Sequence, residues 1–125
     1  MNLLRIHAIA AWAFVITIVI QVFYAGAAIT ALGGSGSFRT HIDFGYSAVG
    51  IAALAVLVTA FLARRPRREI GIVAGLVLLY GVQTSLPYAK VDLPWVAALH
   101  PVNALLLFAL AAWYARRAWH AGVPA

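Results

Sequence analysis

The sequence contains no cysteine and only three acidic residues among its 125. Without cysteine there can be no disulfide, no thiolate metal site, no iron–sulfur cluster and no covalently attached c-type haem. The long apolar runs contain no aspartate or glutamate, which argues against carboxylate-based proton or sodium coupling and against hydrolysis by paired carboxylates. Ser35 and Ser37 lie in a glycine-rich loop without a base to activate them, so we assign no catalytic residue and leave open whether the protein is an enzyme.

Charge is scarce as well, and what there is lies in places typical of a membrane protein. Charged residues make up 10% of the chain and hydrophobic residues 65%, whereas a soluble domain is about a quarter charged. So small a domain cannot bury that apolar excess in its own core. The net charge of +6 does not indicate nucleic-acid binding, because the basic residues flank apolar runs instead of covering one face. The expected partner is the lipid bilayer.

Four apolar runs are each long enough to cross a hydrocarbon core of about 30 Å. They predict membrane-spanning helices over residues 5–31, 44–63, 70–87 and 95–115. The first run is too long for the core of a typical signal peptide. Short connections predict neighbouring antiparallel helices, so the fold class is all-α: an integral membrane, up-down four-helix bundle in one domain over residues 1–125.

The basic residues predict the orientation of this bundle. Lys90 and Arg39 fall on one side of the membrane, and seven arginines fall on the side of the two termini: Arg5, Arg64, Arg65, Arg67, Arg68, Arg116 and Arg117. The positive-inside rule therefore predicts a multi-pass protein of the inner (plasma) membrane with both termini in the cytoplasm. Trp113, Tyr114 and Trp119 are expected to form an aromatic belt on the cytoplasmic side.

Polar side chains gather in the outer half of all four predicted helices. They are Gln21, Tyr24, His41, Tyr80, Gln83, His100 and Asn103. Pairs within a helix are three residues apart, which places both members on one helix face. Lipid penalises such groups, so we expect the faces to meet inside the bundle. His7 is expected at the opposite interface.

Glycines mark expected helix contacts. Gly71 and Gly75 form a G-x-x-x-G pattern on the third helix, and Gly45 and Gly50 lie on the second. Small residues let membrane helices approach closely.

Two histidines from different helices suggest a bound metal, because neutral imidazole is the commonest ligand of transition metals and b-type haem needs no cysteine. We predict that His41 and His100 are the axial ligands of one haem. Gly45 would let the flat macrocycle approach the backbone, and Arg39 would pair with a propionate. Gln21, Gln83 and Asn103 would complete the wall of the site.

Depth in the membrane complicates this pairing. Counted at 1.5 Å per residue from the basic ends of their helices, His41 and His100 differ in height by about 10 Å. The difference shrinks if the fourth helix begins at Pro101, a favoured first helical residue. The alternative is a helix that begins at Pro94 and kinks at Pro101.

Four segments carry a resemblance to a known family: VIQVFYAG, FRTHIDFG, GVQTSL and PWVAALHPVNALLLF, at residues 19–26, 38–45, 81–86 and 94–108. In order and spacing they resemble an uncharacterised family of small four-helix bacterial membrane proteins, with Q-x-F-x-x-G in the first helix, H-x-x-x-G opening the second and L-H-P-x-N-A opening the fourth. The resemblance covers nearly the whole chain and implies the fold, but no activity. A weaker similarity to four-helix b-type membrane cytochromes implies one haem between histidines of different helices.

These observations predict a small membrane protein that carries one haem near the periplasmic face and takes part in electron transport with a quinone or another redox partner. A second interpretation is a structural or accessory subunit of a larger membrane complex, or a homo-oligomer, in which the polar cluster only fixes helix register. A third is a carrier of a small molecule or a metal through the same pocket.

Overall fold

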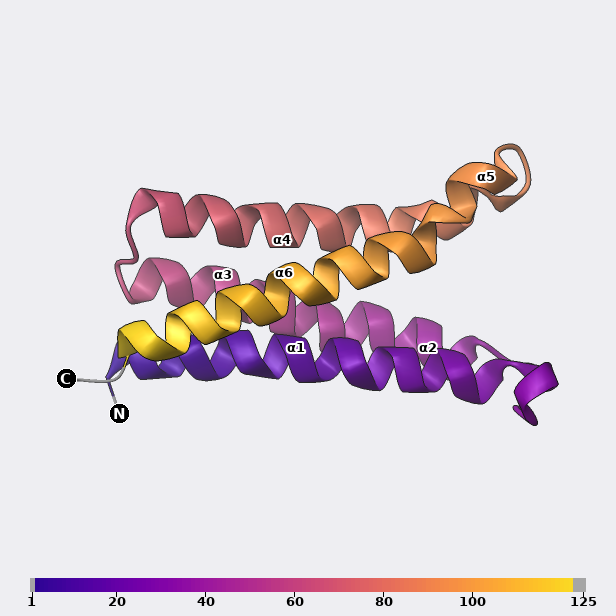
Figure 1. Ribbon diagram of the computed structural model, residues 1–125, viewed down its shortest axis with the longest axis horizontal. Helices are drawn as coiled ribbons and strands as arrows, with labels where there is room; N and C mark the ends of the chain where they lie inside the picture. Colours follow the sequence, from indigo (N-terminus) through magenta and orange to yellow (C-terminus); the bar gives the residue numbers. More distant parts are fainter. Residues whose placement is uncertain (1, 123–125) are drawn as a thin grey trace.

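Four long helical segments lie side by side along the length of the molecule (Figure 1). The structure is a computed structural model, and it describes residues 2–122. The segments are α1 (Leu3–Ala28); α2, η2 and α3 (Arg39–Phe44, Gly45–Val49 and Gly50–Leu62); α4 and η3 (Arg67–Ser85 and Leu86–Lys90); and α5 and α6 (Pro94–Ala97 and Leu99–Gly122), with the short η1 (Thr30–Leu32) after α1. The all-α four-helix bundle is confirmed.

Local sequence explains where these helices begin and end. The side chain of Asn2 caps α1 by accepting the main-chain N–H of Arg5 at 2.8 Å. Gly33, with φ of 79°, ends η1 in the left-handed conformation that glycine adopts without strain. Between α3 and α4 the chain reverses within a few residues, and Pro66 takes the position just before α4, where its missing N–H costs nothing.

Two helix boundaries differ from the predicted ones. The second segment begins at Arg39 instead of residue 44, so His41 lies within a helix and not ahead of one. The fourth consists of the short α5 followed after Ala98 by α6, so His100 is the second residue of a new helix. A helix does begin at Pro94, as one alternative predicted, but the interruption falls at Ala98 and not at Pro101, so the long α6 begins at Leu99.

Packing follows the order of the chain around the bundle. Helix α1 packs against α3 and α6, and α4 closes the ring by contacting α3 and α6. Helix α6 runs obliquely, from α1 at the end where the termini lie to α4 at the opposite end (Figure 1). We call the first of these the basic end, because it carries the arginines of the α3–α4 turn and of the end of α6.

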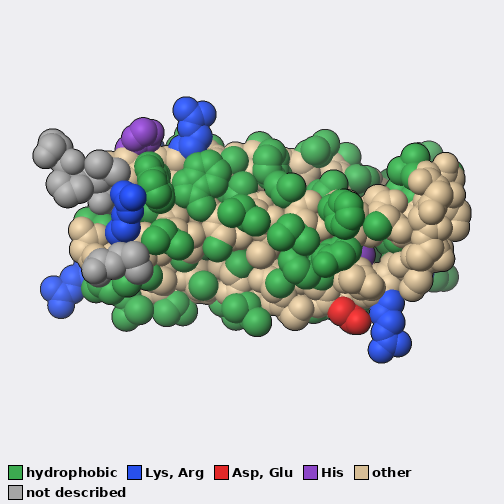
Figure 2. Space-filling view, turned by 90° about the horizontal axis from the view of Figure 1, so that it is seen from below, with side chains coloured by type: hydrophobic (Ala, Val, Ile, Leu, Met, Phe, Trp, Pro, Cys, Tyr) green, Lys and Arg blue, Asp and Glu red, His purple; other side chains and the backbone are tan. Residues whose placement is uncertain are grey.

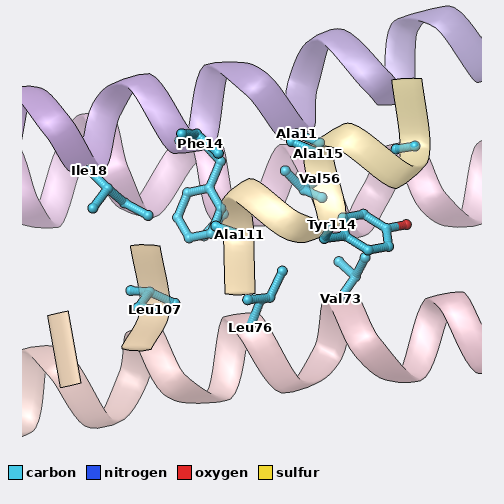
Figure 3. Packing of buried hydrophobic residues seen from close by; sticks show 14 of the residues in the cluster. Ala11, Phe14, Ile18, Val56, Val73, Leu76, Leu107, Ala111, Tyr114 and Ala115 are labelled. Atoms are coloured by element: carbon cyan, nitrogen blue, oxygen red, sulfur yellow. The ribbon is translucent and has the colours of Figure 1, made fainter. Parts of the chain in front are cut away.

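The middle of the bundle is filled by apolar side chains from all four segments. Figure 3 shows Phe14 and Ile18 of α1 directed toward Leu76 of α4 and Leu107 of α6. Phe14 is 1% exposed and Leu107 2%. Since lipid is as apolar as these side chains, their contribution to stability comes from close packing more than from escape from water.

The outer surface is apolar. Large hydrophobic side chains are exposed on every long segment, among them Phe23, Ile51, Leu78 and Leu105. In Figure 2 hydrophobic side chains cover the middle of the face, and Lys and Arg lie toward its ends. Four helical segments have the length and composition to cross a membrane. The chain is therefore a multi-pass membrane protein.

Candidate functional site

The first part of the site joins α1 to α2 through Gln21 and His41. His41 donates its Nδ1–H to the main-chain carbonyl of Gln21, at 3.1 Å. The Gln21 side-chain amide donates back to the main-chain carbonyl of His41 at 2.8 Å and lies 3.3 Å from His41 Nε2. The imidazole is thus held from both sides by a single residue of the preceding helix.

The second part repeats this arrangement between α4 and α6. His100 donates its Nδ1–H to the main-chain carbonyl of Gln83 at 2.9 Å, and the Gln83 amide nitrogen lies 3.2 Å from His100 Nε2. The carbonyl of Gln83 is available because its helical partner would be the N–H of residue 87, which is a proline. His100 takes the place of that missing donor.

The two histidine–glutamine pairs meet. The ring centroids of His41 and His100 are 6.2 Å apart with the ring planes at 73°. Each half of the chain thus forms a helical hairpin in which a glutamine of the first helix anchors a histidine near the start of the second. The sequence shows no internal repeat strong enough to reveal this, because the repeat consists of two side chains and a hydrogen-bond pattern.

The two halves also differ in what holds the glutamine side chain. Asn103 donates to the side-chain oxygen of Gln83 at 2.8 Å and to the carbonyl of Leu79 at 3.1 Å, which fixes the Gln83 amide. The residue three positions after His41 is Phe44, which has no donor, and the side-chain oxygen of Gln21 is buried without a hydrogen-bond partner. The Gln21 side is therefore held less firmly than the Gln83 side.

A π-helical turn, η2, begins four residues after His41 and is joined to α4 by a hydrogen bond. Such turns loosen the regular helical hydrogen bonds. The Tyr80 hydroxyl group donates to the carbonyl of Gly45 at 2.9 Å, and a Cβ on Gly50 would lie 2.8 Å from the same hydroxyl. A Cβ on Gly45 would lie 2.6 Å from the Gln21 amide nitrogen. Both glycines are needed for close approach, and Gly45 accommodates Gln21.

The other glycine prediction is wrong. A Cβ added at Gly71 or at Gly75 would meet nothing within 4 Å. This G-x-x-x-G pattern faces away from the other three segments, because α4 turns the opposite face toward α3 and α6.

Two further predicted residues lie at the rim. The Arg39 side chain is exposed, and its Nε lies 3.6 Å from the Asp43 carboxylate one helical turn later. An ion pair this exposed restrains the side chain only weakly. Tyr24 packs edge-on against the ring of Phe44 with centroids 5.1 Å apart, which extends the contact between α1 and α2.

The hydrogen bonds define the chemistry that the site offers. A carbonyl oxygen only accepts, so both imidazoles carry their proton on Nδ1 and have an unprotonated Nε2, which the amide of Gln21 or Gln83 contacts. Metal-binding histidines usually have this arrangement, in which a carbonyl fixes the ring and leaves the other nitrogen to the metal. Within residues 2–122 no group of three or more His, Cys, Asp or Glu gathers, so a metal here would depend on the two imidazoles and on groups that it brings along.

The sequence analysis missed a second polar cluster, at the basic end. His7 is 1% exposed and lies within hydrogen-bond distance of Thr59 at 3.0 Å and of Tyr114 at 2.7 Å. Tyr114 is fully buried, so placing it in an interfacial aromatic belt was wrong, and so was placing His7 at the interface. Glu69, 3% exposed, pairs with Arg65 and Arg117. The proximity of Thr59, Tyr114 and His7 arises from packing of three helices, which no single segment of sequence reveals.

Comparison with known proteins identifies a family of unknown function, which agrees with the predicted membership of an uncharacterised family. Residues 21–89 match the model of a family of unknown function, DUF6220. The matched region contains Gln21, His41 and Gln83 but ends before His100, so the L-H-P-x-N-A element lies outside it. No curated protein and no solved structure matches the chain.

Proposed function

The chain belongs to this family of unknown function, which supplies no activity, and we propose from the geometry of the site that the protein binds one b-type haem between His41 and His100 and transfers electrons at the membrane. When bound, the haem supplies a one-electron carrier.

One observation carries the proposal: two imidazoles from opposite halves of the bundle lie side by side, with ring centroids 6.2 Å apart, and each has an unprotonated Nε2. Their Nδ1–H groups are already used by the carbonyls of Gln21 and Gln83. Desolvating two rings and aligning them in this way costs free energy that a purely apolar contact would avoid. Ligation of one iron by both lone pairs accounts for the arrangement.

The separation of the rings fits a shared metal. A metal–imidazole bond is about 2 Å, and the nitrogen lies about 1 Å from the ring centre, so rings on opposite sides of one iron have centroids about 6 Å apart. The centroids of His41 and His100 are 6.2 Å apart.

Binding requires the two glutamine amides to leave the Nε2 atoms, which they contact at 3.3 Å and 3.2 Å. The main-chain carbonyls would keep both rings in place while these side chains turn. Gln21, whose side-chain oxygen has no partner, is the one that moves at lower cost, whereas Asn103 opposes rotation of Gln83. The exposed Arg39, beside His41, would pair with a haem propionate.

The membrane setting suggests the electron-transfer partner. The excess of arginine at the basic end favours a cytoplasmic location for that end and for both termini, which would put the haem site near the periplasmic face of the inner membrane. A groove of about 410 Å³ runs along α4, η3 and α5, the elements that precede α6, and its apolar lining includes Leu78, Val82 and Val96. A lipid-soluble quinone, with an isoprenoid chain in this groove, is the partner that such a surface favours.

Absorption spectroscopy tests the proposal. Protein purified in mild detergent after expression with added haem precursor should show a Soret band and, in the reduced-minus-oxidised difference, an α-band. His41→Ala and His100→Ala should each abolish the α-band. His120→Ala is the matched control, because His120 is exposed at the other end of α6, and it should leave the spectrum unchanged. A colourless wild-type protein that stays colourless after haemin is added would refute haem binding.

The alternative function is that of a structural or accessory membrane subunit. It draws on the observation that all four ring nitrogens of His41 and His100 already contact protein groups. Interhelical polar contacts of this kind fix register between membrane helices. In that case both alanine variants lower stability, and no variant or wild-type protein carries a chromophore.

A further inference from the structure

An open hollow lies on the outward face of α6 at the basic end, away from the histidine–glutamine site. Its lining residues recur at helical spacing, so they all come from one side of α6: Ala109, Ala112, Trp113, Arg116, Arg117 and His120. The side of α6 that carries Ala111, Tyr114 and Ala118 is buried in the bundle, so the hollow faces away from it. Its volume, about 550 Å³, is in the range of small-molecule sites, about 300–1,000 Å³.

The lining of this hollow changes from apolar to basic along the helix axis. Counted from Pro94, about 20 residues at 1.5 Å each cross the hydrocarbon core and end near Trp113, which is half exposed. Arg116 and His120 therefore lie at the depth of the lipid headgroups, and Ala109 lies at the depth of the acyl chains. The hollow thus has the same order of polar and apolar parts as a phospholipid that stands beside it.

The positive charge beside the hollow is not neutralised by the protein. Glu69 is the only acidic residue at the basic end, and it already pairs with Arg65 and Arg117. Arg116 forms no ion pair with any of residues 2–122. A counter-ion from outside the chain is therefore expected at Arg116, and at this depth of a membrane the phosphate of an anionic lipid supplies it.

Arg117 is held in a position from which it can contribute to the same phosphate. Its Nε donates to Glu69 of α4, while its side chain is 48% exposed and lines the hollow. Its terminal amino groups make no hydrogen bond within residues 2–122, so they are left to donate to phosphate oxygens. Because Glu69 already orders this guanidinium, less side-chain entropy is lost on binding than with a mobile arginine.

We propose that this hollow binds one anionic phospholipid whose headgroup carries no cation of its own, such as phosphatidylglycerol. Arg116 and Arg117 bind the phosphate by charge-assisted hydrogen bonds, and an acyl chain lies over the two alanines. Trp113 lies between them, at the depth of the ester groups. A zwitterionic lipid brings its own cation to the phosphate, so the arginines favour the anionic lipid. Because Arg117 also holds Glu69, the bound lipid supports the contact between α6 and α4.

Native mass spectrometry of the full chain, released from detergent micelles, counts the lipids that stay bound. Phosphatidylglycerol and phosphatidylcholine with the same acyl chains are titrated separately. The wild-type protein should retain one phosphatidylglycerol and bind it at least about tenfold more tightly than phosphatidylcholine, because each basic residue that faces an anionic headgroup contributes about fivefold in affinity. By the same reasoning Arg116→Gln should weaken the binding of phosphatidylglycerol about fivefold.

Matched variants separate this site from the general charge of the basic end. Arg67→Gln removes the same charge from the same end, at an exposed position outside the hollow, and should change the affinity less than about twofold because solvent screens that charge. Ala109→Phe keeps every charge but fills the apolar part of the hollow, so it should weaken binding. Leu105→Phe, which lies one turn earlier on α6, exposed and outside the hollow, should leave binding unchanged.

Equal affinities of the wild-type protein for the two lipids would overturn the proposal. Equal losses in Arg67→Gln and Arg116→Gln would do so as well, because the lipid would then follow the net charge alone. A dimer that disappears in Ala109→Phe would also contradict it, since a second copy of the chain would then occupy the hollow. If Arg116→Gln fails to fold, as judged by circular dichroism, the comparison of Ala109→Phe with Leu105→Phe decides, because neither variant alters a charged group.

Discussion

His100 Nδ1 lies 2.9 Å from the main-chain oxygen of Gln83. This contact fixes the ring of a residue at the start of α6 to the end of α4, and it exists because the proline at position 87 leaves that oxygen without its helical donor. The orientation of the imidazole therefore depends on Pro87, because its nitrogen carries no hydrogen to donate.

Replacing Pro87 should loosen His100. Pro87→Ala restores an N–H that competes for the carbonyl of Gln83, so the ring nitrogen signals of His100 should broaden or shift and haem occupancy should fall. Pro94→Ala, which removes the proline that begins α5, is the control and should leave these signals in place. Identical His100 spectra in Pro87→Ala and wild-type protein would show that the missing donor does not anchor the ring.

Asn103 should stabilise the Gln83 half of the site. Its amide makes two hydrogen bonds inside the bundle, to Gln83 and Leu79. Asn103→Leu should lower the free energy of unfolding by about 1–2 kcal/mol, since interhelical hydrogen bonds in membranes each contribute about 0.6 kcal/mol and at most about 1.7. Unfolding in mixed micelles, followed by circular dichroism, measures the change. Leu106→Ala, on the exposed face of α6, should have almost no effect.

Glycine substitutions should separate the close contacts from the open face. Gly50→Ala places a Cβ 2.8 Å from the Tyr80 hydroxyl group and should cost about 1–3 kcal/mol, because the ring cannot move aside freely. Gly45→Ala meets only the end of the flexible Gln21 side chain, so it should displace that amide from His41 at a smaller cost in stability.

Gly71→Ala and Gly75→Ala are the matched controls for these two. Both positions are open, and alanine favours a helix over glycine by about 1 kcal/mol, so the stability should stay the same or rise. A loss at Gly71 or Gly75 comparable to that at Gly50 would mean that the α4 face is covered by a partner in the membrane.

Neutralising Glu69 should lower the stability of the protein far more than neutralising Asp43, although both residues form ion pairs. Glu69 is 3% exposed, and Glu69→Gln leaves the buried Arg65 and its neighbour Arg117 without a counter-charge, at a cost of about 3 kcal/mol or more. The Arg39–Asp43 pair is largely exposed, so Asp43→Asn should change stability by less than about 0.5 kcal/mol. Equal effects in the unfolding assay would contradict the buried network.

Composition and hydropathy were sufficient to predict the bundle, because residues facing lipid must be apolar along a full span. They also identified Gln21, His41, Gln83 and His100, since polar residues stand out in such runs. Composition and hydropathy could not predict which of these side chains pair with one another. The height estimate separated His41 from His100 because it treated the helices as upright and uniform, whereas the second span begins earlier, contains a π-helical turn and faces an oblique α6.

The polar cluster at the basic end could not be predicted from the sequence for a different reason. His7 and Tyr114 lie near the ends of their apolar runs, where interfacial residues are common, and nothing local distinguishes a buried side chain there. Glu69 lies in the first turn of α4, where a carboxylate is favourable in any helix because it complements the helix dipole. One signal in the sequence points to this cluster: acidic residues are nearly absent, so the only glutamate in the chain has to balance the charge of a region rich in arginine.

The proposal that His41 and His100 supply the two axial nitrogens is tested most directly by replacing each ligand with a free one. In His41→Gly and His100→Gly, prepared separately, the α-band of the wild-type protein should be lost and should return when imidazole is added, because imidazole occupies the space of the missing ring and binds the iron. A wild-type protein without a haem spectrum, or glycine variants that keep the wild-type band without imidazole, would contradict the assignment.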